Sequence, residues 1–405
     1  LRVRQVNLEE EVHRMPSANA KPRVAMVVDP WHHPFNGTVV STRRFVAALS
    51  DRFRFHKLVA DEPGQSLGEG CVGFSRISIP GINPIIDRMK APLAKPDRLQ
   101  LERVIADSDV LHVQFPFFLG HAAISEARRQ GKPVVASFHV QPENILSNLN
   151  LSSKWLTAII YKFFVWRFYD RADCVIAPSQ FAADLLAKAG LKVPVTVLSN
   201  GVTEDFFVDR AAAAQGPPFH VVSVGRLAAE KQQHHLIEAI AASAFKQDIK
   251  LSLVGTGPQQ KRLEGQARSL GVAATIGRVS DETLRHLYRT ADLFVQTSAV
   301  ELEGMSVLEA MAAGCPVLIN KASTSAVPEF VTAQEATYSM NNVPELARKL
   351  DTLLASAELR EAAGRTNRQI AKTRSHERSV QILCNIYTRV LNPSDCVDDE
   401  HINRP

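Results

Sequence analysis

Cysteine is scarce in this chain of 405 residues, and its five thiols include no pair in CxxC spacing: Cys71, Cys174, Cys315, Cys384 and Cys396. An odd and scattered set of this kind excludes a disulfide framework and indicates a reducing compartment. Residues 1–21 are charged and lack the apolar segment of a secretory signal. We therefore expect a cytoplasmic protein.

Long apolar runs are also absent. The most apolar stretch, residues 156–169, contains Lys162 and Arg167 and is too short to cross a bilayer. The net charge of +5 is too small to indicate nucleic acid as a partner, but it suits an anionic ligand or an anionic membrane surface. The remaining composition, 45% hydrophobic and 22% charged, is that of a soluble globular chain long enough for two domains.

Short apolar runs rich in β-branched residues alternate with helical patterns along most of the chain. This alternation predicts an α/β fold with two Rossmann-like, doubly wound units. The runs of the first unit are 21–30, 110–116, 133–140 and 173–179. Those of the second unit are 193–202, 219–225, 251–257, 274–279, 292–298 and 315–320.

We place the domain boundaries from this series. The prediction is an extension over residues 1–21, a first domain over 22–190, a second domain over 191–376, a last helix over 377–391 and a tail over 392–405. Ligands of open parallel sheets bind beyond the carboxyl ends of the strands. Two facing units of this kind therefore predict a cleft between them.

The loop SVGRLAAEKQQ (223–233) follows a predicted strand and precedes a helix, and it carries two cations. Arg226 offers a planar fork of five donors, and Lys231 offers a compact charge on a flexible stem. At the mouth of a cleft they would clamp a diphosphate. In an ordinary surface loop they would simply be solvated, and the loop alone does not distinguish the two interpretations.

The segment ELEGMSVLEAMAAGCPVLIN (301–320) brackets a glycine-containing loop with Glu301 and Glu309. Ser306 and Glu309 fit a capping box at the start of a helix, which explains Glu309 but not Glu301. The alternative is a sugar site, because the amides of residues 304–307 favour anions and hydroxyl oxygens, and a carboxylate on either side accepts hydrogen bonds from hydroxyls. Glu303, between the two acids, is expected to be solvated.

These two segments together resemble the retaining glycosyltransferases of family 4, which have the GT-B fold. The resemblance extends from about residue 22 to residue 391 and includes SNGV (199–202), LVGTGP (253–258), IGRVSDETL (276–284) and ADLFVQTS (291–298). It implies that the last helix, 377–391, packs back on the first domain. The loop reads ELEGMS, without the aromatic residue of the commoner EGFG form.

The resemblance also implies residue roles. Arg226 and Lys231 would neutralise the nucleotide diphosphate, Glu309 would hold the ribose, and Glu301 with the 304–307 amides would hold the transferred sugar. The donor-binding set implied in this way is Gly37, Arg226, Lys231, Gly277, Arg278, Val279, Glu301, Gly304, Met305, Ser306, Val307 and Glu309. The catalytic set is His139, Arg226, Lys231 and Glu301.

Two of these assignments fall in the first unit. Gly37, in Asn36-Gly37-Thr38 after the first predicted strand, matches the family's loop near the phosphates, where a small residue permits close approach of the backbone. His139, at a strand end, matches the histidine that faces the donor sugar; the alternative is a purely structural histidine. Asp107 and Asp109 superficially resemble a metal-binding DxD, but they precede a strand, so we expect no metal and no cofactor.

The implied reaction moves a hexose from a nucleotide-diphosphate sugar to an acceptor hydroxyl with retention of configuration, by attack on the face that the diphosphate leaves. The loop variants look most similar to members that glycosylate diacylglycerol-type membrane lipids, with UDP-glucose as the expected donor and GDP-mannose as the next choice. A polysaccharide or other soluble acceptor is the alternative. A non-catalytic nucleotide-binding protein and a sugar-nucleotide epimerase on the same fold also fit the fold class.

A contact with membrane is suggested by residues 152–171, which contain seven aromatic residues. On a helical wheel an apolar face forms opposite Lys154, Tyr161, Lys162 and Tyr169; its members are Trp155, Leu156, Ile159, Ile160, Phe163, Phe164 and Trp166. Such a helix lies in a membrane interface or packs inside the first domain. Because Arg167 falls on the apolar side, we favour packing inside the domain.

Overall fold

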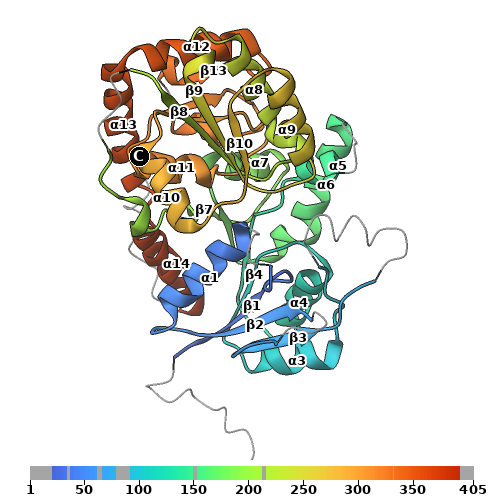
Figure 1. Cartoon of the computed structure of the whole chain (residues 1–405). Helices are drawn as coiled ribbons and strands as arrows, with labels where there is room; N and C mark the ends of the chain where they lie inside the picture. The colour runs from blue at the N-terminus through green and yellow to red at the C-terminus, as the bar shows by residue number, and fades with distance from the viewer. Residues whose placement is uncertain are drawn as a thin grey trace, which may run out of the picture.

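The computed structural model describes residues 21–33, 37–61, 66–78, 92–148, 153–211, 216–331 and 333–392. Two parallel sheets, each with its own covering helices, form two Rossmann-like domains (Figure 1). The predicted fold class is therefore confirmed. Residues 1–20 of the predicted extension, the tail beyond Asn392, and Asn36 lie outside the described residues.

Among the described residues the first sheet has seven strands in the order β3-β2-β1-β4-β5-β6-β7, all parallel. The strands are β1 (Arg23–Val27), β2 (Arg54–Ala60), β3 (Cys71–Phe74), β4 (Val110–Val113), β5 (Val134–Ser137), β6 (Cys174–Ala177) and β7 (Val195–Val197). The helices are α1 (Gly37–Leu49), α3 (Arg98–Ala106), α4 (Phe118–Arg129), α5 (Pro142–Asn148), α6 (Lys154–Arg167) and α7 (Gln180–Lys188).

The second sheet has six parallel strands in the order β10-β9-β8-β11-β12-β13. They are β8 (Phe219–Val224), β9 (Ile249–Val254), β10 (Ala274–Gly277), β11 (Leu293–Gln296), β12 (Val317–Asn320) and β13 (Thr337–Tyr338). The helices are α8 (Gln233–Ala242), α9 (Gln260–Ser269), α10 (Asp281–Thr290), α11 (Met305–Ala312), α12 (Val343–Ala355), α13 (Ala357–Lys372) and α14 (His376–Leu391).

The strand order reverses once in each sheet, between β1 and β4 in the first and between β8 and β11 in the second. At such a switch point the two neighbouring connections leave in opposite directions, so a crevice opens outside the carboxyl ends of the strands. The loop after β8 begins at Gly225 and the loop after β11 begins at Thr297. These are the two loops that carry the candidate cations and the first candidate carboxylate.

The assignment of residues 193–202 to the second unit is wrong. Within this segment β7 pairs in parallel with β6, with Val175 opposite Val195, and so closes the edge of the first sheet. The boundary at residue 190 is correspondingly too early. The pattern missed β2, β3 and β13, because polar residues such as His56 and Lys57 interrupt β2 and the other two strands are very short.

The last helix, α14, packs on the first sheet beside α1 (Figure 1). Leu383, Cys384 and Tyr387 of α14 are buried in one cluster with Val24 and Met26 of β1. The alternating side chains of β1 therefore serve two cores, one under α14 and the other on the opposite face of the sheet. Helix α14 is therefore part of the core of the first domain, although it follows the second domain in the sequence.

The Asp107-x-Asp109 pair is structural, as expected. Asp107 follows the last residue of α3, and the Asp109 carboxylate accepts a hydrogen bond from the Arg23 amide at 2.7 Å. Both acids lie before β4, at the amino ends of the strands and on the opposite side of the sheet from the switch-point crevice. Their position leaves the crevice to other residues.

Candidate active site

The ammonium of Lys231 and the carboxylate of Glu301 meet at the switch point of the second sheet, with Nζ and Oε1 2.5 Å apart. Lys231 ends the short 3-10 turn after β8, and Glu301 follows β11, the neighbouring strand. The Gln296 amide, at the end of β11, also donates to Glu301 Oε1 at 3.1 Å. The structure thus brings together two residues that the family resemblance assigned to one donor site.

The backbone around Lys231 is tied to the β11 loop. The Thr297 hydroxyl donates to the Lys231 carbonyl at 2.7 Å, and the Ala299 amide donates to the Glu230 carbonyl at 2.9 Å. Two loops that are remote in sequence are therefore held as one surface. The backbone of Lys231 is therefore fixed relative to the loop that carries Glu301.

Arg226 lies at the start of the same loop and pairs with Glu230, Nη2 to Oε1 at 2.8 Å. The turn that carries it packs against the loop after β9 at unusually short range. A Cβ on Gly255 would lie 2.0 Å from the Gly225 carbonyl oxygen, and one on Gly257 would lie 2.2 Å from the Leu227 carbonyl oxygen. These glycines are required because the backbones themselves are in contact.

Helix α11 begins differently from the capping-box prediction, which is wrong. Gly304 is the N-cap residue, in the left-handed region at φ 85°, and no side chain caps the helix; Met305 is its first residue. A Cβ on Gly304 would lie 2.4 Å from Val327 Cγ2. Among the described residues no side chain caps α11, although the Val307 amide donates to the Gly304 carbonyl at 2.9 Å. In α10, by contrast, the Ser280 hydroxyl accepts from the Thr283 amide.

Glu309 accepts a hydrogen bond from the Tyr288 hydroxyl of α10 at 3.2 Å instead of reaching back to the helix start. Burial raises the pKa of Glu309 to about 7, and the charge of Arg44 on α1 opposes that rise. Arg44 belongs to the first domain, so the two domains approach each other at this carboxylate. A carboxylate in this environment gains from any hydroxyl that hydrogen-bonds to it.

Glu303 is not solvated, contrary to the sequence prediction. Its side chain is 5% exposed and accepts from the Ser199 hydroxyl, and from the Asn200 amide and side-chain nitrogen at 3.1 and 2.6 Å. Burial raises the pKa of Glu303 to about 7, against the lowering effect of these donors. The SNGV segment lies after β7, so Glu303 joins the α11 loop to the end of the first sheet.

A pH dependence follows for Glu303. Because its folded pKa of about 7 exceeds the ordinary value of 4.5, the folded state holds more protons than the unfolded state between these values. The contribution of Glu303 to the free energy of unfolding is therefore largest near pH 4.5 and is lost as the pH rises through about 7. Between pH 5 and pH 8 the free energy of unfolding of the wild type should fall by on the order of 2 kcal/mol more than that of Glu303→Gln.

Urea unfolding at the two pH values measures this difference. Burial shifts Glu309 and Asp29 in the same direction and lowers the pKa values of His112 and His139, so only the difference between wild type and variant isolates Glu303. Glu358→Gln controls for the loss of one surface carboxylate, because Glu358 is exposed in the first turn of α13. Equal pH slopes for wild type and Glu303→Gln would show that Glu303 is ionised throughout.

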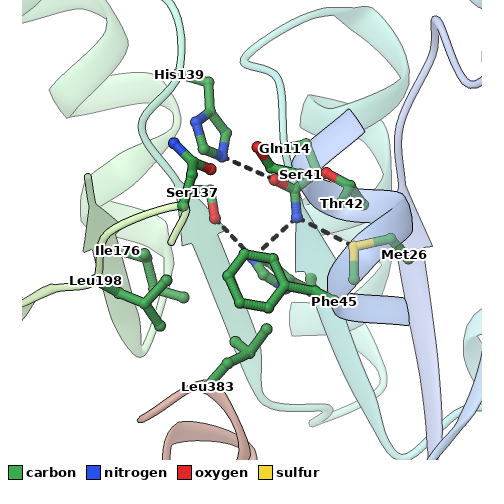
Figure 2. A pocket seen from close by; sticks show the side chains of 12 residues that line it. Met26, Ser41, Thr42, Phe45, Gln114, Ser137, His139, Ile176, Leu198 and Leu383 are labelled. Carbon is green, nitrogen blue, oxygen red and sulfur yellow. Dashed lines mark hydrogen bonds between the residues drawn. The ribbon is translucent and has the colours of Figure 1, made fainter. Parts of the chain in front are cut away.

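His139 lies at the end of β5 above a small cavity of about 20 Å³ in the first domain (Figure 2). Its Nε2 is 3.0 Å from Gln114 Oε1. The Gln114 side-chain nitrogen in turn lies 3.1 Å from Met26 Sδ and 3.2 Å from His112 Nε2, both acceptors for it. The orientation of Gln114 therefore places the proton of His139 on Nε2 and leaves a lone pair on Nδ1.

The chain of hydrogen bonds continues to the last helix. With Nε2 accepting from Gln114, His112 carries its proton on Nδ1, which lies 2.7 Å from the Tyr387 hydroxyl of α14. Burial lowers the pKa of His139 to about 4 and that of His112 to about 3, so both imidazoles are neutral at pH 7. His139 can orient a polar substrate group, but it does not supply a positive charge.

The first domain contacts the α11 side at two further points. The Gln141 side-chain amide donates to the Thr324 carbonyl at 3.2 Å, and the Ser179 hydroxyl donates to the Leu302 carbonyl at 2.6 Å. Helix α5, which follows His139, lies beside the turn that carries Lys231. The loops that carry the candidate residues of the two domains therefore lie next to each other.

The remaining candidates are Gly277, Arg278 and Val279 in the second domain and Gly37 in the first. Gly277 ends β10, its carbonyl accepts from the Gly255 amide at 2.8 Å, and Arg278 and Val279 follow it. Gly37 is the first residue of α1 instead of a loop residue, with open space around its α-carbon. Sequence analysis missed Gln114, Gln296, Asn200 and Glu303. The SNGV motif and the unusual acid in ELEGMS were the signals for the last two.

Two family models match the chain. The one described as Glycosyltransferase Family 4 matches residues 35–206, and the one described as Glycosyl transferases group 1 matches residues 206–370. The two matches meet at residue 206, between the two sheets. Together they span residues 35–370, a range that includes every candidate site residue but neither β1 nor α14.

Curated relatives are similar at modest identity. An alpha-monoglucosyldiacylglycerol synthase of Streptococcus pneumoniae is 27% identical over 52% of this chain and 51% of its own length. Sulfoquinovosyl transferase SQD2 of Arabidopsis thaliana is 26% identical over 87% of this chain and 71% of its own. A GDP-mannose-dependent alpha-mannosyltransferase of Corynebacterium glutamicum is 26% identical over 73% of this chain and 71% of its own. The chain thus spans about half the length of the streptococcal relative.

Solved structures share the architecture. Sucrose-phosphate synthase from Thermosynechococcus elongatus superposes with a TM-score of 0.73 at 17% identity, covering 92% of this chain and 100% of that one. HepE from Anabaena, in complex with UDP and glucose, superposes with a TM-score of 0.69 at 20% identity, covering 91% and 99%. At these identities the likeness shows the fold alone.

Proposed function

The chain belongs to the family 4 glycosyltransferases and has their GT-B fold, and from this premise we propose that it transfers glucose from UDP-glucose to a diacylglycerol-type membrane lipid with retention of configuration. The observation that carries the proposal is the Lys231–Glu301 pair beside the uncapped start of α11. It combines a cation, amides at a helix start that no side chain caps, and a carboxylate acceptor. A sugar diphosphate needs all three.

In this proposal the donor lies in the second domain. Lys231 and Arg226 neutralise the diphosphate, with the first amides of α11 as further donors. Glu309 accepts from the ribose hydroxyls, and Glu301 accepts from hydroxyls of the transferred sugar. The loop of Gly277, Arg278 and Val279, at the edge of the crevice, lies against the base.

We propose that the acceptor binds in the first domain and that the transferred sugar reacts next to His139. The bond between the sugar and the diphosphate breaks, and the acceptor oxygen forms its bond to the same carbon from the same face. The acceptor proton passes to the departing phosphate oxygen. Because Lys231 and Arg226 supply positive charge at that oxygen, we propose that the reaction requires neither a metal nor another cofactor.

The names of the relatives support the choice of substrates. The streptococcal protein is a synthase of an alpha-linked glucosyldiacylglycerol, and SQD2 transfers another sugar, sulfoquinovose. UDP-glucose carries its glucose in α linkage, so an α-linked product corresponds to retention. The mannosyltransferase relative uses GDP-mannose, which makes GDP-mannose the competing donor.

One experiment tests the proposal. The protein is incubated with UDP-glucose, UDP-galactose or GDP-mannose, with diacylglycerol in mixed micelles or with a soluble glycan, and the products are identified by mass spectrometry and NMR. We expect α-glucosyldiacylglycerol and one UDP per turnover, at a rate that EDTA leaves unchanged. Transfer of mannose would overturn UDP-glucose as the donor, and a glycan product would overturn the lipid acceptor. A β-linked product would overturn retention of configuration. Inhibition by EDTA would overturn the proposal that no metal is required.

A further inference from the structure

A stripe of large apolar side chains lies exposed along α6. Four of the nine large apolar side chains that are exposed among the described residues belong to this helix: Trp155 at 74%, Ile159 at 41%, Phe163 at 54% and Trp166 at 66%. Spacings of four, four and three residues put all four on one side of a helix. Two of the three tryptophans of the chain are in this stripe.

The other side of α6 is already buried, so the stripe is not part of the domain's core. Tyr161, Phe164 and Val165 are buried there, and the Tyr161 hydroxyl donates to Glu143 of α5 at 2.9 Å. The preference for packing the whole apolar face inside the domain is therefore wrong. Tyr161 and Tyr169, which the helical wheel places on the polar face, are buried. Their burial leaves Trp155 and Trp166 exposed on the other side of the helix.

The charge on α6 is of one sign. Lys154 and Lys162 are exposed, the Arg167 guanidinium stacks over Trp166 at 5.2 Å, and the helix contains no carboxylate. Asp170, just beyond its end, accepts a hydrogen bond from the Lys192 amide. A surface that pairs tryptophan and phenylalanine with cations is complementary to anionic phospholipid headgroups.

The stripe is connected to the candidate active site. Glu143, the partner of Tyr161, lies on α5, which follows His139 and lies beside the turn that carries Lys231. In Figure 1, α5 and α6 run along one side of the junction between the two domains. A flat lipid surface at α6 would therefore lie next to the crevice.

We propose that α6 is the docking surface for an anionic bilayer, an inference that rests on the proposed lipid acceptor. Trp155, Ile159, Phe163 and Trp166 enter the headgroup region while Lys154 and Lys162 contact the phosphates. The helix of 14 residues lies flat in the interface. Among the described helices none has the length and apolar character to span a bilayer.

Vesicle sedimentation tests the docking surface without any sugar transfer. We expect the full chain to bind phosphatidylglycerol vesicles in a salt-sensitive manner and phosphatidylcholine vesicles weakly. The double variant Trp155→Ser/Trp166→Ser should lower the partition coefficient by about tenfold or more, and Lys154→Glu/Lys162→Glu should remove the preference for phosphatidylglycerol. The control is Leu99→Ser on α3, whose side chain is also 66% exposed and lies outside the stripe.

The outcomes separate this inference from the proposed function. Absence of vesicle binding, or binding that both α6 variants leave unchanged, overturns the docking surface even if micellar diacylglycerol is glucosylated. Conversely, α6-dependent binding with transfer only to a soluble glycan supports the surface and overturns the acceptor. A concentration-dependent dimer that the tryptophan variant dissociates would assign the stripe to a second copy and also overturn the proposal.

Discussion

Replacement of Lys231 by alanine is expected to lower kcat by about 10²–10³-fold, the scale of removing one charged partner of a transition state. Negative charge grows on the diphosphate as the sugar departs, and Lys231 is the cation held between the β8 and β11 loops. Its pairing with Glu301 at 2.5 Å shows that its ammonium lies where the sugar and the diphosphate are proposed to meet. Arg226→Ala is expected to lower kcat by a similar factor.

Rate measurements at saturating donor distinguish this role from a structural one. The side chains of Lys231 and Glu301 are only 21% and 16% exposed, so loss of the ion pair should lower the free energy of unfolding by about 1–3 kcal/mol, and the variant still folds. Lys250→Ala is the matched control, because Lys250 is exposed on β9 near the opposite end of the same sheet. If Lys231→Ala had the same kcat as Lys250→Ala, Lys231 would have no role in stabilising the transition state.

The proximity of Lys231 and Glu301 was predictable because it depends on strand order. Each residue follows a run of β-branched residues, and parallel strands bring their carboxyl ends to one edge of a sheet. The periodicity located those runs without knowledge of which strands are neighbours. It located the run of β7 but assigned it to the wrong unit, because a short run between two domains fits the edge of either sheet and only tertiary pairing with β6 decides.

The environment of Glu303 was not predictable from its own segment. Its partners Ser199 and Asn200 come from the loop after β7, at a separation of 103 or more residues, and its burial results from the approach of the two domains. Local chemistry favours solvation for an isolated glutamate between two other acids. Here three donors from one remote loop reverse that preference, so the error has a tertiary cause.

The two faces of α6 were assigned incorrectly for a different reason. A wheel that counts tyrosine as polar puts Tyr161 outside, but a tyrosine ring is largely apolar and its hydroxyl needs one partner only. Glu143 provides that partner inside the domain. Once Tyr161 and Phe164 are buried, the helical period leaves Trp155 and Trp166 no position except the surface.

Replacement of Gly304 by alanine is expected to destabilise the protein by about 2–4 kcal/mol and to lower kcat/KM by about 10²-fold. At φ 85° an alanine is strained, and its Cβ would lie 2.4 Å from Val327 Cγ2, so the start of α11 must shift. A shift there moves the amides proposed to hold the diphosphate and the sugar. Donor affinity by calorimetry and urea unfolding measure the two effects separately.

Gly265→Ala in α9 is the matched control, because a Cβ there meets nothing within 4 Å. Alanine inside an unstrained helix should stabilise the chain by about 0.5–1 kcal/mol and leave donor affinity unchanged. If Gly304→Ala lost stability but kept full donor affinity, the α11 amides would not contact the donor, and Lys231 and Arg226 alone would have to hold the diphosphate. Loss of affinity in a variant that still folds would instead tie donor binding to the left-handed turn at Gly304.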